Sequence, residues 1–144
     1  MPLDLEHKEP LEPLVAAGFD PRLPTFCSAL GIIQFLTLEA VDALLRFAAG
    51  RAKGSEIVLS FTPPDDELDE RSLRRVRESE VRTQDYGEPW LTRLRPSQLT
   101  ARLRLLGFSD IELLTPDLAN QRYFHGRSDG LASTPSGQVM AAAV

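Results

Sequence analysis

The chain has 144 residues, the length of one globular domain, and carries 16 basic against 21 acidic residues for a formal net charge of −5. Binding to nucleic acid needs a clustered excess of Lys and Arg, so this balance argues against a nucleic-acid partner. No apolar run is long enough to span a bilayer, and the first ten residues lack a secretion signal. A single cysteine, Cys27, excludes an internal disulfide, and we expect a cytoplasmic protein without a membrane partner.

The first part of the chain predicts a βαβ unit. Its opening, "PLDLE", resembles the tail of a strand, and residues 8–21 predict a short helix that Gly18 ends. A short apolar strand is expected over residues 25–30. The helix that follows is the clearest prediction, because Thr37 can cap it and apolar residues then recur at helical spacing: Leu38, Val41, Leu44, Leu45 and Ala48. Residues 56–62 predict a second strand, apolar enough to be covered on both faces and parallel to the first.

A highly charged helix is expected next, over residues 66–86. Acidic side chains lead and basic ones follow, with favourable helical spacing in the pairs Glu67–Arg71, Glu70–Arg74 and Glu78–Arg82. Its apolar stripe is thin, which is typical of a solvated helix beside a sheet. The alternative is that residues 64–90 form a helical insertion that moves as a cover over a binding site.

The last third predicts a helix that ends at Gly107, a strand over residues 109–115, a short helix from Pro116 and a final strand over residues 137–144. Two late strands joined by a short excursion indicate an antiparallel hairpin at the edge of a sheet. The chain therefore predicts a mixed α/β fold.

No self-sufficient catalytic motif is present in the sequence. The two histidines, His7 and His125, are far apart and lack the spacing of metal ligands, so no metal site is expected. In open α/β sheets, however, ligands bind at the carboxyl ends of the strands. Asp4, Leu30 and Gly31 occupy such positions, and a carboxylate such as Asp4 can accept a hydrogen bond from a purine amino group. The alternative for Asp4 is an N-terminal cap or an exposed charge.

Several segments resemble one family in order and with compatible spacing. These are "PLDLE", "LVAAGFDPRLPTF", "ALGIIQFLTLEAVDALLRFAAGRAKGSEIVLSF" and the tail from "ARLRLLGFSDIELL" to "RYFHGRSDGL". Together they look like the second half of a bacterial S-adenosylmethionine-dependent methyltransferase of the leucine carboxyl methyltransferase-like group, which includes polyketide O-methyltransferase relatives. The resemblance implies the C-terminal part of a Rossmann-like class I methyltransferase sheet, with residues 1–144 as one partial domain. It implies parallel strands plus the antiparallel C-terminal hairpin, without the glycine-rich half that holds the cofactor's methionine moiety and ribose.

The resemblance also implies a site for S-adenosyl-L-methionine and a small-molecule methyl acceptor. Asp4 and Leu5 match the family's pair of residues that contacts adenine, and Gly31 matches the glycine at the end of its fourth strand. Leu30 stands where the family has glutamate, and Phe35 where it has tyrosine. The implied cofactor-binding residues are thus Asp4, Leu5, Leu30 and Gly31. For Gly31, two interpretations stay open, namely close approach of the backbone to a ligand and a tight turn into the next helix.

Two functions follow from these observations. The first is methyl transfer to an oxygen of a small molecule or carboxylate, with no residue identified as the catalytic base; Tyr123 and His125 qualify by residue type alone. The second is a non-catalytic module that pairs with another chain. The strand at residues 25–30 would be an exposed apolar edge, which predicts self-association or a partner.

Overall fold

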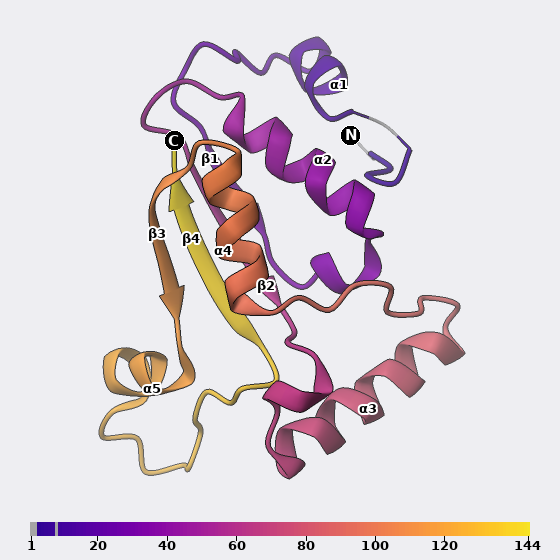
Figure 1. Ribbon diagram of the computed structural model, residues 1–144, viewed down its shortest axis with the longest axis vertical. Coiled ribbons are helices and arrows are strands. Elements are labelled where there is room, and N and C mark those ends of the chain that lie inside the picture. Colours follow the sequence, from indigo (N-terminus) through magenta and orange to yellow (C-terminus); the bar gives the residue numbers. More distant parts are fainter. Residues whose placement is uncertain (1–2, 8) are drawn as a thin grey trace.

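A computed structural model describes residues 3–7 and 9–144 (Figure 1). Its helices are α1 (Leu11–Ala16), α2 (Leu38–Ala49), α3 (Glu70–Asp85), α4 (Pro96–Leu105) and α5 (Pro116–Ala119). Its strands are β1 (Phe26–Ala29), β2 (Glu56–Phe61), β3 (Ser109–Leu114) and β4 (Gln138–Ala143). The predicted α/β class and the predicted order of elements from α1 onward are confirmed.

The four strands form one mixed sheet in the order β1-β2-β4-β3. β1 and β2 run parallel, with Ala29 opposite Leu59, because the crossover through α2 brings the chain back in the same direction. β4 is antiparallel to both β2 and β3, so the expected C-terminal hairpin is present. β4 lies inside the sheet between β2 and β3, and β3 forms the outer edge.

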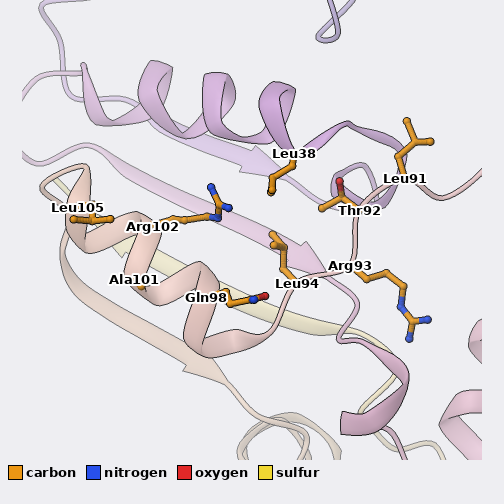
Figure 2. Close-up of a pocket in the computed structure, with 9 residues that line it drawn as sticks. All are labelled: Leu38, Leu91, Thr92, Arg93, Leu94, Gln98, Ala101, Arg102 and Leu105. Atoms are coloured by element: carbon orange, nitrogen blue, oxygen red, sulfur yellow. The ribbon is translucent and has the colours of Figure 1, made fainter.

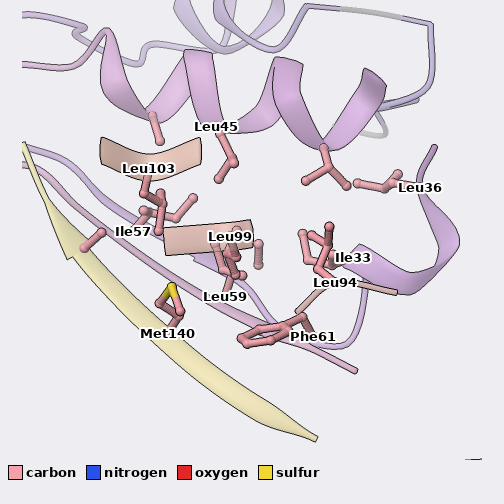
Figure 3. Close-up of a cluster of buried hydrophobic side chains, with 14 of the residues drawn as sticks. Ile33, Leu36, Leu45, Ile57, Leu59, Phe61, Leu94, Leu99, Leu103 and Met140 are labelled. Carbon is pink, nitrogen blue, oxygen red and sulfur yellow. The ribbon is translucent and has the colours of Figure 1, made fainter. Parts of the chain in front are cut away.

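The hydrophobic core lies between one face of this sheet and the helices α2 and α4. Leu45 of α2 and Leu99 and Leu103 of α4 are fully buried and point toward the sheet (Figure 3). These leucines pack in one cluster with Ile57 and Leu59 of β2 and Met140 of β4, which project from the sheet. The fully buried side chains of β2 and β4 alternate along each strand and lie on this one face, which is the period-two pattern of a half-buried sheet.

The second face of the sheet is only partly buried by the described residues. Alternate residues Val58 and Ser60 of β2 are half-buried, and Ser28 of β1 is exposed. In Figure 1, α2 and α4 lie on the viewer's side of the sheet and no helix is drawn behind it. The expectation that residues 56–62 are covered on both faces is therefore wrong within the described chain.

The opening of the chain also differs from the prediction. Residues 5–7 form a turn and no strand is assigned over residues 3–6, while Pro2 lies outside the described residues. The Glu6 carboxylate accepts hydrogen bonds from the Thr37 backbone N–H at 2.7 Å and from its hydroxyl at 2.9 Å. Thr37 in turn accepts from the N–H of Ala40 at 3.2 Å, as expected for a helix N-cap. The turn is thus anchored to the start of α2.

The ion pairs expected along α3 are absent among the described residues. Glu67 belongs to a 3-10 turn that precedes α3, so it lacks helical spacing to Arg71 and instead pairs with Arg95 at 2.7 Å. The other two pairs, Glu70–Arg74 and Glu78–Arg82, lie on an exposed face where an ion pair gains little over hydration.

Candidate functional site

A groove of about 490 Å³ lies beside the carboxyl end of β1 and is built from three separate segments. Two of the predicted site residues, Asp4 and Leu5, line it. The turn after β1 and the chain between α3 and α4 supply the rest. The lining residues are Leu3, Asp4, Leu5, Glu6, Ile32, Phe35, Leu36, Gly87, Glu88, Pro89 and Leu91. Apolar side chains dominate this surface, so it can hold a flat ring.

The Asp4 carboxylate both lines the groove and shapes the turn that carries it. One of its oxygens accepts from the backbone N–H of Glu6 at 3.0 Å, and the other lies 2.9 Å from the ring nitrogen Nδ1 of His7. Asp4 thus stabilises a turn and caps no helix, since the first helix begins at Leu11. A carboxylate oxygen can accept more than one hydrogen bond, so these contacts are compatible with a ligand donor.

Leu30 and Gly31 follow β1 but do not line the groove. The Leu30 side chain is 55% exposed. Gly31 adopts φ +72°, its N–H donates to the hydroxyl of Ser60 at 2.7 Å, and its carbonyl accepts from the side chain of Gln34 at 3.0 Å. A Cβ at Gly31 would meet no atom within 4 Å. The positive φ therefore accounts for the glycine by itself, and the space above it is open.

The wall formed by residues 87–91 is held against the turn after β1. The backbone N–H groups of Leu91 and Thr92 donate to the carbonyl of Gln34 at 2.7 and 3.2 Å. The rings of Phe35 and Trp90 meet edge-to-face with centroids 6.4 Å apart. The sequence did not predict the contacts that hold this wall, because they join segments more than fifty residues apart and no local motif marks them.

Carboxylates are the charged groups that line the groove. Asp4, Glu6 and Glu88 contribute them, and neither Lys nor Arg is among the lining residues. The Glu6 carboxylate is engaged by Thr37, whereas the Glu88 side chain is exposed and makes no hydrogen bond or ion pair with the described residues. Such a lining suits a ligand that is neutral or positively charged and offers hydrogen-bond donors, and it disfavours phosphate.

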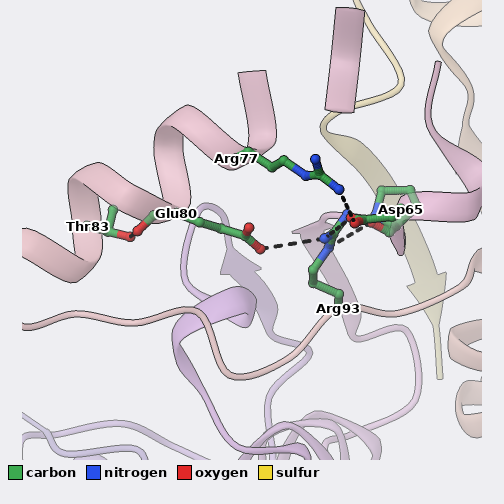
Figure 4. A network of polar contacts seen from close by, with 6 residues as sticks. Asp65, Arg77, Glu80, Thr83 and Arg93 are labelled. Carbon is green, nitrogen blue, oxygen red and sulfur yellow. Dashed lines mark hydrogen bonds and ion pairs between the residues drawn. The ribbon is translucent and has the colours of Figure 1, made fainter. Parts of the chain in front are cut away.

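Arg93 joins the carboxyl end of β2 to the chain that forms this wall (Figure 4). Its guanidinium donates to the carbonyl of Pro63 at 3.0 and 2.6 Å, pairs with Asp65, and lies 3.5 Å from Glu80. The hydrogen bond from Arg93, helped by the nearby Arg77, lowers the pKa of the Asp65 carboxyl below its ordinary value. The contact fixes the start and the end of the segment that contains α3.

A larger groove of about 620 Å³ lies between α2 and α4 (Figure 2). Its polar side chains are already matched: Arg102 pairs with Asp42 at 2.6 Å, and the Gln98 carbonyl accepts from the N–H of Arg95 at 3.2 Å. Figure 2 shows Arg93 pointing away from α4. None of the predicted site residues lines this groove, and no unmatched group in it indicates a ligand.

Other reactive groups lie outside the candidate site. Tyr123 and His125 are exposed and do not line the groove. Burial raises the pKa of the Cys27 thiol, which makes it a poor nucleophile. Over residues 3–7 and 9–144, no group of three His, Cys, Asp or Glu side chains is placed to hold a metal ion. The same residues include no helix of the length and apolarity that crossing a membrane requires.

Comparison with known proteins finds similarity to methyltransferases in sequence and in fold. Residues 1–49 match the model of the leucine carboxyl methyltransferase family. A Mycobacterium avium protein provisionally named an S-adenosyl-L-methionine-dependent methyltransferase is 38% identical over 88 residues, which are 60% of this chain and 28% of that protein. The chain thus matches little more than a quarter of the length of this relative.

Two solved structures share the fold. A DUF574 family protein from Streptomyces avermitilis superposes with a TM-score of 0.59 at 18% identity, covering 98% of this chain and 53% of the other. A SAM-dependent methyltransferase from Archaeoglobus fulgidus gives 0.53 at 15% identity, covering 87% and 61%. The Rossmann-like fold is confirmed, and the resemblance drawn from the sequence is confirmed as a similarity to the leucine carboxyl methyltransferase family over residues 1–49 and to relatives named as S-adenosyl-L-methionine-dependent methyltransferases.

Proposed function

We propose that the groove beside β1 binds the nucleoside end of S-adenosyl-L-methionine and that the chain serves methyl transfer to an oxygen of a small molecule or carboxylate. One observation carries the proposal: Asp4 and Leu5 share a groove with Ile32 and Phe35 at the carboxyl end of a parallel strand. Leu5 and Ile32 would cover the faces of the adenine ring, and Asp4 would accept from its amino group. The carboxylate lining fits a cofactor that carries positive charge and no phosphate.

The cofactor supplies a methyl group on a sulfonium, which is already a good leaving group. The protein then contributes mainly proximity and orientation of the acceptor oxygen. A carboxylate acceptor is ionised near neutral pH and needs no proton removed, whereas a hydroxyl acceptor needs a general base. We assign no residue to that role. The free Cys27 supports a cytoplasmic location.

Residues 64–90 form a cover in this proposal, with α3 as its body. Ser72 and Val76 are the residues of α3 that are buried, so little apolar contact holds the helix in place. Arg93 fixes the ends of the segment through its hydrogen bond to the carbonyl of Pro63, and residues 87–89 line the groove. Hydrogen exchange with and without cofactor tests this, and we expect slower exchange across residues 70–91 when cofactor is bound. Equal exchange in the two states would refute the cover.

Calorimetric titration with S-adenosyl-L-methionine tests the binding site, and quenching of the single tryptophan, Trp90, gives a second readout. We expect micromolar binding that weakens about tenfold in Asp4→Asn, the loss of one charge-assisted hydrogen bond. Asp20→Asn is the matched control. Asp20 accepts from the N–H of Arg22 at 3.0 Å, as Asp4 does from Glu6, but it lies outside the groove. Equal affinities of the two variants would contradict the site.

A non-catalytic module that pairs with another chain is the second proposed function. It is favoured by Leu30 and Phe35, which replace the family's polar pair, and by β1, whose second edge has no partner strand among the described residues. Absent or millimolar cofactor binding, together with tight binding to another protein, would support this function over the first.

A further inference from the structure

Three exposed leucines line the groove between α2 and α4. The side chains of Leu38, Leu91 and Leu105 are 41%, 54% and 87% exposed, and Leu105 is the most exposed of the large apolar residues described. The charged contact across the groove, Arg102 with Asp42, is an ion pair within the chain and leaves no net charge there. Exposed apolar side chains gathered in one place mark interaction surfaces. The groove is therefore suited to contact with another protein.

The three leucines lie at opposite ends of this groove (Figure 2). Leu105 projects at the end where α4 finishes, and beside it a smaller hollow of about 170 Å³ has Arg46 in its lining. Leu38 and Leu91 lie at the other end together with the buried Leu94, where α2 begins and the chain leads into α4. One end thus offers a protruding apolar side chain, and the other end offers an apolar recess.

Charges along α2 follow the same end-to-end arrangement. Glu39 lies in the first turn of α2 and Arg46 in its last turn, so the two are separated by about two turns and lie on one side of the helix. Both side chains are exposed, and neither has an ion-pair partner within the described chain. The surface that both of them line adjoins the groove, because Arg46 also lines the hollow near Leu105.

Both arrangements match a second copy of the same chain. A twofold axis makes every contact twice, so one patch must supply both halves of each contact. With the axis crossing α2 and α4 near their midpoints, each helix lies antiparallel to its counterpart. Leu105 of each copy then faces Leu91 and Leu94 of the other, and Glu39 of each copy faces Arg46 of the other.

We propose that the groove between α2 and α4 is a homodimer interface, in which two copies pack α2 against α2 and α4 against α4 in antiparallel orientation. A twofold axis parallel to the helices is disfavoured, because it would place Arg46 of one copy near Arg104 of the other, at the end where both helices finish. The interface uses no residue of β1, so it differs from self-association through the strand edge. It goes beyond the proposed function and does not depend on it.

Sedimentation of the chain of 144 residues over a range of concentrations tests the interface. We expect a reversible equilibrium between monomer and dimer. Leu105→Arg should weaken the dimer about a hundredfold, because burial of one leucine changes an association constant about tenfold or more and each dimer buries two. Leu105 is exposed in the single copy, so the fold should be unaffected. The matched control Val81→Arg lies on exposed α3 and should leave the dimer intact.

A pair of charge reversals tests the orientation. Glu39→Arg and Arg46→Glu each place like charges opposite one another in a homodimer, so each variant alone should dimerise more weakly than the parent chain. An equimolar mixture of the two variants should restore the dimer, because each acidic side chain again faces a basic one. Native mass spectrometry with one variant isotopically labelled identifies the mixed dimer, and circular dichroism verifies that every variant is folded.

A parent chain that stays monomeric up to submillimolar concentration would overturn the proposal. A dimer that Phe26→Arg on β1 dissociates and Leu105→Arg leaves intact would also overturn it, because that dimer would use the strand edge. Failure of the two folded charge variants to form a mixed dimer would refute the antiparallel arrangement.

Discussion

Replacing Gly31 with alanine separates the two explanations for this glycine. At φ +72° an L-residue is strained, while its Cβ would meet no atom within 4 Å. The substitution therefore adds backbone strain without a clash. Left-handed backbone costs an L-residue about 1–2 kcal/mol, and alanine recovers about 0.5 kcal/mol through the stiffer unfolded chain. We expect a net loss of about 1 kcal/mol in the free energy of unfolding, or roughly 4 °C in Tm for a chain of this size.

Gly54→Ala is the matched control because Gly54 has φ +86° and equally open surroundings. Gly54 precedes the amino end of β2, whereas Gly31 follows the carboxyl end of β1. Thermal unfolding should show the same loss in both variants. The close-approach explanation predicts that titration with S-adenosyl-L-methionine shows a weakening of at least tenfold in Gly31→Ala alone, because a ligand that extends from the groove over Gly31 would meet the added methyl group. If Gly31→Ala and Gly54→Ala bind the cofactor equally well, the glycine serves the turn and the close-approach explanation is refuted.

Three further predictions concern the scaffold. Leu45→Ala should lower the free energy of unfolding by about 3 kcal/mol in chemical denaturation, because Leu45 is fully buried between α2 and the sheet; a loss below about 1 kcal/mol would contradict that packing. Thr37→Ala should cost about 1 kcal/mol by removing the cap of α2 and the hydroxyl contact to Glu6, and an unchanged Tm would argue against both bonds. Arg93 lowers the pKa of Asp65, so this pair stabilises the fold above the unfolded-state pKa of about 3.9 and the stabilisation is lost as pH falls through the lower folded-state pKa. Tm measured from pH 5 down to pH 2 should therefore fall more steeply in the parent chain than in Asp65→Asn, and parallel curves would refute the coupling.

Local features of the sequence were enough to predict most elements. The cap at Thr37, the helical spacing of apolar residues after it and the glycine stops at Gly18 and Gly107 mark their own helices, because each depends on contacts within one or two turns. The parallel pairing of β1 and β2 followed from the helix between them. Asp4 and Leu5 were identified through a family resemblance, and the structure places both in one groove.

The tertiary structure alone decided how distant segments meet. Glu67 pairs with Arg95 because a 3-10 turn removes it from α3, and no sequence spacing encodes that choice. The wall at residues 87–91, including Glu88, is held at the groove by backbone hydrogen bonds to Gln34, which any residue type except proline could donate. Alternation along β2 showed that one face is buried, but whether a second layer covers the other depends on what packs against it. Helices, turns and strands depend mainly on residues close together in the sequence. These contacts join segments that are distant in the sequence, so they form only when the whole chain folds and the loops between them close.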